Sequence, residues 1–250
     1  MARTQTHEIV LDGTPEEVWR LLSEADGITR WFAPEARVND GRLWLSYGPG
    51  MEGEGKIHLS EPGKAFGWTE SGAMPKVVEF YLEGEGGKTR LRLVQSGFGE
   101  GAEFDSEYEA VSGGWRTYLA TMAFGLLHHK SDGCTQVAKM SMLPGKREDF
   151  IAKLSSLLGF ASPLGSLTLG GGYEADLGSL GKVRGVRLDP DKPGYYLLTL
   201  ENWEQSLMGL FVESFGDQLA VTQQWYLFGA AQEKSEAVQG AITQWMESLT

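Results

Sequence analysis

The sequence predicts an α+β protein in which a curved antiparallel sheet wraps a long helix, with this arrangement present twice in tandem. Three observations lead to this prediction. Short runs rich in β-branched and aromatic residues, separated by Gly and Pro, occupy residues 41–96. A long segment with helical periodicity follows at residues 106–130. The last residues of the chain, 236–249, resemble the middle of that segment.

Composition and charge exclude several classes of partner. The chain has 250 residues, of which 41% are hydrophobic, so it is long enough for one large domain or two smaller ones. Its 22 basic and 34 acidic side chains give a net charge of −12, which repels both a nucleic-acid backbone and an anionic membrane surface. We therefore expect neither nucleic acid nor a membrane as a partner.

The sequence contains no pattern typical of a secreted, membrane-spanning or metal-binding protein. Its first residues carry charges where a signal peptide needs an apolar core, and no run approaches the roughly 20 apolar residues of a membrane span. The single cysteine, Cys134, cannot form an internal disulfide, and no His and Cys residues have the spacing of a zinc site. The expectation is a cytoplasmic protein without a metal or cofactor.

The first part of the chain predicts a strand followed by two short helices. Thr14 can cap the first helix, Pro15 suits its first position, and Glu17 is spaced to close a capping box. Ser23 with Asp26 forms a second, weaker helix start. Adjacent side chains on a helix point about 100° apart. We therefore expect the two rings of the Trp31-Phe32 pair that follows to have different roles, because one apolar face cannot easily bury both.

Residues 41–96 predict an antiparallel meander with one apolar face. With Gly86-Gly87 as a two-residue turn, apolar residues pair on one face and charged or polar residues on the other. The expected pairs are Leu82–Leu91 and Phe80–Leu93, then Glu83–Arg90 and Tyr81–Arg92. A turn at Pro62-Gly63 likewise places apolar residues opposite one another, as the pairs Leu59–Phe66 and Ile57–Trp68. Another element must cover this apolar face.

The covering element is predicted in residues 106–130. Ser106 and Glu109 are spaced as a capping box, and apolar residues follow at helical spacing. These residues are Val111, Trp115, Tyr118, Leu119, Met122 and Leu126. A strand, two short helices, about six more strands and a long closing helix is the element order of a helix-grip fold, in which the sheet curves round the last helix.

Residues 5–128 resemble the START-like, or SRPBCC, superfamily, and within it the group named for the activator of the heat-shock protein 90 ATPase. The resemblance rests on four stretches in order, TPEEVWRLLSEADGITRWFAP, GRLWLSYG, GKIHLSEPGKAFGWTE and GGWRTYLATM. It implies a helix-grip fold with a cavity between the sheet and the long helix. It implies little about chemistry, since the superfamily includes lipid carriers, hormone receptors and polyketide cyclases.

The second half of the chain resembles a degenerate copy of the first. The stretch EAVSGGWRTYLATM at 109–122 aligns with EAVQGAITQWMESL at 236–249, which places Ile242 at the position of Trp115 and Trp245 at that of Tyr118. We predict a START-like domain at residues 1–130 and a second, degenerate one at 131–250. The alternative is one helix-grip domain followed by an unrelated α+β extension.

The four histidines do not form a catalytic or metal-binding pattern. His7 is on the first predicted strand, and His58 is on the charged side of a later one. His128 and His129 end the long helix, where they suit the negative end of its dipole. We predict no metal ligand among them.

Other polar residues also have structural explanations. Strand parity places Glu79 and Arg92 outside, in a ladder of opposite charges. Cys134 is expected to be a buried strand thiol. The glycine-rich segments at 48–55 and 169–181 lack the strand-turn-helix setting of a phosphate loop, so we expect flexible loops over a cavity mouth.

A group of aromatic residues forms the candidate ligand site. Its members are Trp31, Phe32, Trp44, Phe66, Trp68, Phe80, Trp115, Tyr118 and Met122. The alternative is that each simply packs the core. We expect these residues to bind a small hydrophobic or aromatic molecule, without a catalytic residue, in a protein that is either a monomer, as a pseudo-dimer, or a homodimer.

Two other functions stay open. The resemblance implies a cochaperone-like protein that acts on a heat-shock protein 90 ATPase, with a chaperone as its partner. A cyclase or hydratase of the SRPBCC superfamily would need an ionisable group that faces the cavity. Strand parity identifies no such group, so the sequence favours a binding protein over an enzyme.

Overall fold

Two separate antiparallel sheets organise the protein. The computed structural model, which describes residues 3–72, 74–215 and 217–249, divides into a first unit at residues 1–130 and a second unit at 131–250. Each unit has its own sheet, its own helices and its own apolar core. Both are therefore α+β structures, as the sequence predicts.

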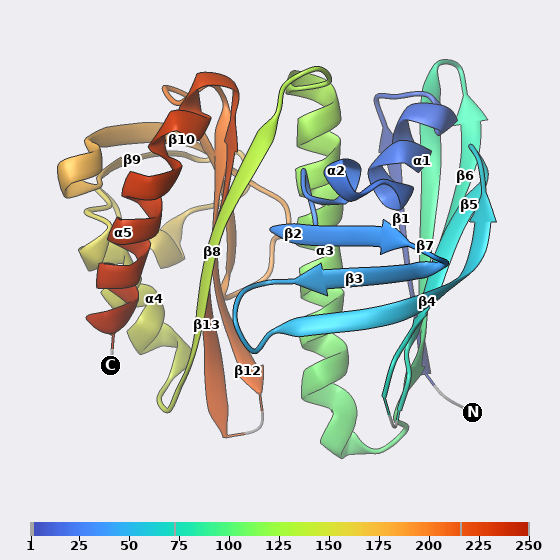
Figure 1. Ribbon diagram of the computed structural model, residues 1–250. Coiled ribbons are helices and arrows are strands. Elements are labelled where there is room, and N and C mark those ends of the chain that lie inside the picture. The colour runs from blue at the N-terminus through green and yellow to red at the C-terminus, as the bar shows by residue number, and fades with distance from the viewer. Residues whose placement is uncertain (1–2, 73, 216, 250) are drawn as a thin grey trace. The chain divides into compact units, whose positions relative to one another are not determined.

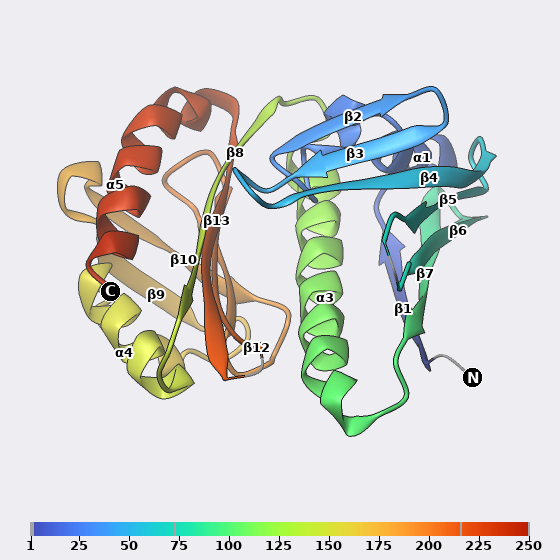
Figure 2. The same cartoon turned by 60° about the horizontal axis from the view of Figure 1, so that its bottom comes forward.

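The first unit has the predicted order of elements. They are β1 (Arg3–Leu11), α1 (Pro15–Ser23), α2 (Ala25–Ile28), β2 (Glu35–Asn39), β3 (Arg42–Ser46), β4 (Glu52–Glu61), β5 (Ala65–Glu70), β6 (Val77–Glu85), β7 (Lys88–Phe98), a 3₁₀ turn (Ala102–Phe104) and α3 (Asp105–His128). The strands form a seven-stranded sheet in the order β1-β7-β6-β5-β4-β3-β2. Figures 1 and 2 show the sheet curving round one side of α3, which is the helix-grip arrangement.

The predicted start of α1 is confirmed. The Thr14 hydroxyl accepts a hydrogen bond from the Glu17 backbone N–H, and the Glu17 carboxylate accepts one from the Thr14 N–H, at 3.3 and 2.8 Å. The predicted start of the second helix at Ser23 differs from the structure. The N-cap residue of α2 is Glu24, and its side chain makes no capping hydrogen bond. Helix α2 is four residues long, and a turn follows it in which the Trp31 and Phe32 N–H groups bond the Ile28 carbonyl at 3.3 and 3.0 Å.

The strand registers are confirmed at one turn and corrected at another. All four residue pairs predicted around Gly86-Gly87 are present. At Pro62-Gly63 the pair Ile57–Trp68 is present, but Phe66 pairs with Ser60 because the register shifts between Ile57 and Leu59. A bulge of this kind bends a strand and increases its twist.

Helix α3 is present, but its predicted cap is wrong. The helix begins at Asp105, after a 3₁₀ turn, and its N-cap residue, Phe104, makes no side-chain cap. Ser106 therefore lies inside the first turn. The predicted apolar stripe from Val111 to Leu126 does pack on the sheet core.

The second unit repeats the plan of the first. Its elements are β8 (Cys134–Leu143), α4 (Arg147–Leu157), β9 (Gly172–Asp176), β10 (Lys182–Leu188), β11 (Tyr195–Leu200), β12 (Ser206–Phe215), β13 (Gln218–Phe228) and α5 (Ser235–Glu247), with 3₁₀ turns at 164–166, 178–180 and 229–234. The six-stranded sheet has the order β8-β13-β12-β11-β10-β9. In both units the first strand pairs with the last, and the others follow in reverse order. The fold is thus a tandem pair of helix-grip units.

Two predictions about local structure need correction. The segments at 48–55 and 169–181 are not only loops, since β4 begins at Glu52 and β9 at Gly172. Cys134 begins β8 but is only partly buried. In both segments the backbone, glycines included, pairs with a neighbouring strand, β4 with β3 and β9 with β10.

Candidate functional site

Eight of the nine predicted site residues belong to the apolar core of the first unit. They are Trp31, Phe32, Phe66, Trp68, Phe80, Trp115 and Met122, which are buried, and Tyr118, which is partly exposed. The strands contribute three of these residues, the turn after α2 contributes two, and α3 contributes three. We call this set the aromatic cluster.

Phe32 lies at the centre of the aromatic cluster. Its ring stacks on Trp115 with 5.1 Å between centroids and meets Tyr118 edge-on at 4.9 Å. It also stacks on the neighbouring Trp31, whose indole N–H donates to the Leu21 carbonyl at 2.9 Å. Both adjacent rings therefore enter the same cluster, which corrects the expectation that they divide their roles.

Trp44 lies apart from the aromatic cluster. Its neighbours in β3, Leu43 and Leu45, pack in the core, so the alternation of the strand directs Trp44 to the opposite face. There its ring lies under the Arg37 guanidinium, 4.3 Å from the ring centroid. Its predicted place beside the other eight residues is wrong because adjacent strand residues face opposite sides.

The inner face of the sheet changes from apolar to polar along its strands. In four strands, inward-facing apolar residues are followed on the same face by polar residues, at the strand end that lies near the start of α3. These series are Leu91, Leu93 and Gln95 in β7; Leu11, Ile9, His7 and Gln5 in β1; Phe80, Val78 and Lys76 in and before β6; and Phe66, Trp68 and Glu70 in β5. We call the polar members of these series, Gln5, His7, Glu70, Lys76 and Gln95, the polar end.

Several polar-end side chains are held by α3. The buried Gln95 accepts a hydrogen bond from the Trp115 indole N–H, and the Gln5 amide donates to the Tyr108 carbonyl. The Lys76 ammonium forms an ion pair with Glu107 at 2.6 Å, with the lysine side chain only 15% exposed. Hydrogen bonds and ion pairs thus join the polar end to the helix.

Glu70 is the inward-facing ionisable group that the sequence analysis missed. It follows Phe66 and Trp68 at the same strand parity, and its backbone N–H bonds the carbonyl of Lys76 at 2.8 Å. Burial raises the pKa of its carboxyl, an effect that Lys76 opposes and the negative charge of Glu107 reinforces. The spacing Phe66, Trp68, Glu70 is the sequence signal that could have identified it.

The histidines do not converge in the described residues. Burial lowers the pKa of His7, with a smaller contribution from Arg116, so its ring is neutral at neutral pH. His58 lies on the outer face between Thr69 and Glu79, at 3.2 Å from each. Among the described residues, no group of His, Cys, Asp and Glu has the geometry to hold a metal ion.

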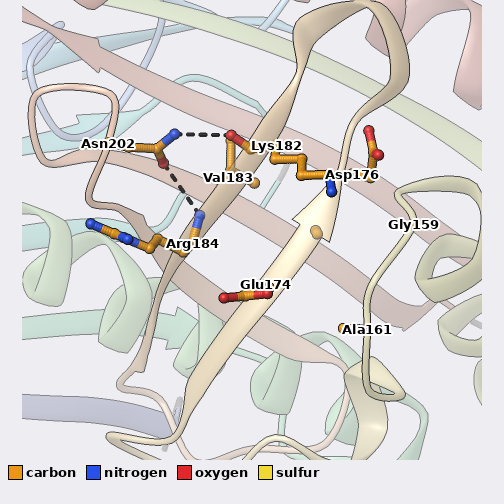
Figure 3. A pocket seen from close by; sticks show the side chains of 9 residues that line it. Gly159, Ala161, Glu174, Asp176, Lys182, Val183, Arg184 and Asn202 are labelled. Atoms are coloured by element: carbon orange, nitrogen blue, oxygen red, sulfur yellow. Dashed lines mark hydrogen bonds between the residues drawn. The ribbon is translucent and has the colours of Figure 1, made fainter.

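A surface pocket in the second unit has a volume of about 440 Å³ (Figure 3). Opposite charges face each other across β9 and β10, where Asp176 pairs with Lys182 and Glu174 with Arg184. Asn202 bridges this edge by donating to the Lys182 carbonyl at 2.9 Å and accepting from the Arg184 backbone N–H at 3.3 Å (Figure 3). The charges compensate one another, so the pocket gives no preference for a charged ligand.

Residues 12–124 match the model of the family described as Activator of Hsp90 ATPase homolog 1-like protein. The first unit is therefore a domain of this family, of the START-like, or SRPBCC, type. No curated protein matches the chain. Within the described residues, the structure contains no helix long and apolar enough to cross a membrane.

Several solved structures are similar to the chain. The Aha1 dimer from Colwellia psychrerythraea is 21% identical, with a TM-score of 0.43, over 50% of this chain and 96% of its own. A protein from Mesorhizobium loti is 26% identical, with a TM-score of 0.45, over 50% of this chain and 96% of its own. The di-domain ARO/CYC protein BexL is 14% identical, with a TM-score of 0.46, over 97% of this chain and 94% of its own.

Proposed function

We propose that the first unit binds a small hydrophobic or aromatic molecule between its sheet and α3. The observation that supports this proposal is that the aromatic cluster reaches the surface instead of ending in a closed core. The Phe32 ring meets the rings of Tyr47 and Tyr118 edge-on, with centroids 5.9 and 4.9 Å away. Both tyrosines are only partly buried. A flat apolar ligand gains most where aromatic surface is still in contact with water.

A glycine on β4 and a glycine on α3 leave open space beside the backbone. Gly53 pairs with Leu45, so it belongs to the inner face of the sheet, and a Cβ there would meet none of the described atoms within 4 Å. On α3, a Cβ at Gly114 would meet only the Tyr118 ring, at 3.9 Å. Val111, Gly114 and Tyr118 are spaced to share one flank of α3. We take Gly53 and Gly114 as the two walls of the ligand mouth.

The aromatic residues then have two roles. Phe66 and Phe80 are buried between the sheet and α3 and contact neighbouring rings. Side chains of this kind would form the rigid floor of the site. Phe32, Trp115 and Tyr118, which lie closest to the mouth, would contact the ligand. In this proposal the protein acts in the cytoplasm, where its one thiol stays reduced.

A neutral aromatic probe tests the proposal. We expect 2-(hydroxymethyl)naphthalene to shift the indole N–H resonances of Trp115 and Trp68 in two-dimensional NMR. The resonances of Trp203, Trp225 and Trp245, which belong to the core of the second unit, should not move. Equal shifts in both units, or none in the first, would contradict the proposal.

The variant Gly114→Leu is designed to close the mouth without unfolding the protein. Leucine is a better helix former than glycine by about 0.8–1 kcal/mol, so the variant should be at least as stable as the parent. We expect it to weaken probe binding by about tenfold or more, since the added side chain occupies the open space. The control is Gly240→Leu in α5, where a Cβ also meets none of the described atoms within 4 Å and where binding should be unchanged.

One observation favours an enzyme as the second candidate. Glu70 faces inward and carries a raised pKa, which is the acid–base group that a cyclase or hydratase would need. Turnover of a bound ligand that Glu70→Gln abolishes would support this candidate over simple binding. The family description suggests a third role, and stimulation of a purified heat-shock protein 90 ATPase would support it.

A further inference from the structure

Resting on the proposed function, we propose that Glu70 selects the ligand, and that the preferred ligand is an aromatic or apolar molecule carrying a cationic amine. The apolar part would lie on the aromatic cluster at the mouth, and the ammonium group would lie against the Glu70 carboxylate. Three structural observations support this assignment.

The first is the position of Glu70 relative to the mouth. Glu70 pairs with Gly55 across β4 and β5, and Gly53 is two residues further along the same face of β4. On α3, Glu107 is spaced to share the flank of Gly114 and Tyr118. The carboxylate therefore lies on the inner face at the end where the glycine walls leave space.

The second is that the nearest cation is already neutralised. Lys76 lies across from Glu70 on the neighbouring strand, but its ammonium group forms its ion pair with Glu107. Arg3, a further cation near the polar end, pairs with Asp105. Among the described residues, the Glu70 carboxylate forms no hydrogen bond or ion pair of its own. A cation supplied by a ligand would complete the site.

The third is the charge that surrounds the site. Glu70 and Glu107 share one lysine, Lys76, so these three side chains together carry a net negative charge. An anionic ligand would face two carboxylates and a lysine that has already formed its ion pair. A neutral ligand would leave the partly buried Glu70 carboxylate uncompensated. An ammonium group both neutralises the carboxylate and donates charge-assisted hydrogen bonds to it.

Three probes with the same ring test the inference on the full-length protein by calorimetry: 2-(aminomethyl)naphthalene, 2-(hydroxymethyl)naphthalene and 2-naphthoate. At neutral pH we expect the amine to bind about tenfold more tightly than the alcohol, and the carboxylate to bind most weakly. If the alcohol binds and the amine has no advantage, the inference is wrong while the proposed function stands. If no probe binds, the proposed function fails as well.

Two substitutions locate the preference. Glu70→Gln should reduce the advantage of the amine to about twofold or less without weakening the alcohol. The control Glu83→Gln, on the exposed outer face of the same sheet, should leave the advantage of the amine unchanged. Glu107→Gln should also reduce the advantage, because it frees Lys76 to neutralise Glu70. An amine preference that survives both Glu70→Gln and Glu107→Gln would overturn the assignment.

Discussion

At the scale of single residues, Phe32 shows how the space between the first sheet and α3 is filled. Its ring contacts rings from the strands and from α3, including Trp68 at 6.3 Å and Trp115 at 5.1 Å. It is 8% exposed and so belongs to the buried core. The turn after α2 carries two adjacent rings into one cluster, with the Trp31 and Phe32 backbone N–H groups both bonded to the Ile28 carbonyl.

Glu70 gives a prediction about stability and pH. Its pKa is raised from 4.5 by burial in the folded protein, so the folded state binds more protons than the unfolded state in the window just above 4.5. Stability should therefore fall as the pH rises through that window. Glu70→Gln removes this loss and should stabilise the protein at neutral pH by at most about 1 kcal/mol, after allowance for solvent screening.

Urea unfolding between about pH 4 and pH 8 checks this prediction. The variant and the parent should have the same free energy of unfolding at the acid end, where the carboxyl is protonated in both states. Lys76 and Glu107 are the charged groups that act on Glu70, so Glu83→Gln, on the exposed outer face opposite Arg90, serves as the control. A Glu70→Gln variant that is less stable at neutral pH would argue for a structural ion pair instead.

Glu70 could have been identified from the sequence, whereas its lack of a partner could not. Strand alternation places it on the face of Phe66 and Trp68, which is a local property of the chain. Whether Lys76 neutralises it depends on Glu107, which is brought close only by the packing of α3 on the sheet. Periodicity reports the face of an element and says nothing about which charged groups meet across it.

At the scale of elements, the start of α1 is specified by local chemistry. Both hydrogen bonds of its capping box lie within four residues of the chain, so they need no tertiary contact. Thr14→Ala should therefore cost about 1 kcal/mol of the free energy of unfolding of the first unit. Glu17→Gln, which keeps a side chain able to complete the box, should cost about 0.3 kcal/mol or less. Equal losses in the two variants in chemical denaturation would contradict this account.

The strands show where local chemistry is insufficient. The two-residue turn at Gly86-Gly87 determines its register, because both glycines adopt positive φ, of 60° and 84°. The register after Pro62-Gly63 also depends on the curvature of β4 over the helix, which a shift between Ile57 and Leu59 accommodates. A regular alternation pattern cannot predict a bulge that the rest of the sheet imposes.

At the scale of the whole molecule, each unit has the contents of a domain. The buried core of residues 1–130 and that of residues 131–250 share no member, and each includes its own closing helix. We therefore propose that residues 1–130 and 131–250 are separate START-like domains, the second one degenerate. The alternative of an unrelated extension does not account for the shared strand order.

Expression of the two pieces tests this proposal. We expect residues 1–130 and 131–250 each to give a soluble protein with a single cooperative unfolding transition, because each piece keeps its whole apolar core. Circular dichroism and calorimetry would report the transitions, with the intact chain as the control. A second piece without a cooperative transition would show that it depends on the first.

The sequence by itself determined the order of elements in the first unit, the start of α1, the hairpin at Gly86-Gly87 and, of the nine predicted site residues, the eight that belong to the core. These features follow from periods and bonds that span a few residues. Only the tertiary structure decided that Trp31 and Phe32 share one cluster and that Lys76 forms its ion pair with Glu107 and not with Glu70. Those outcomes depend on how elements far apart in the chain pack together, because the contacts between them are fixed by the curvature of the sheet round α3.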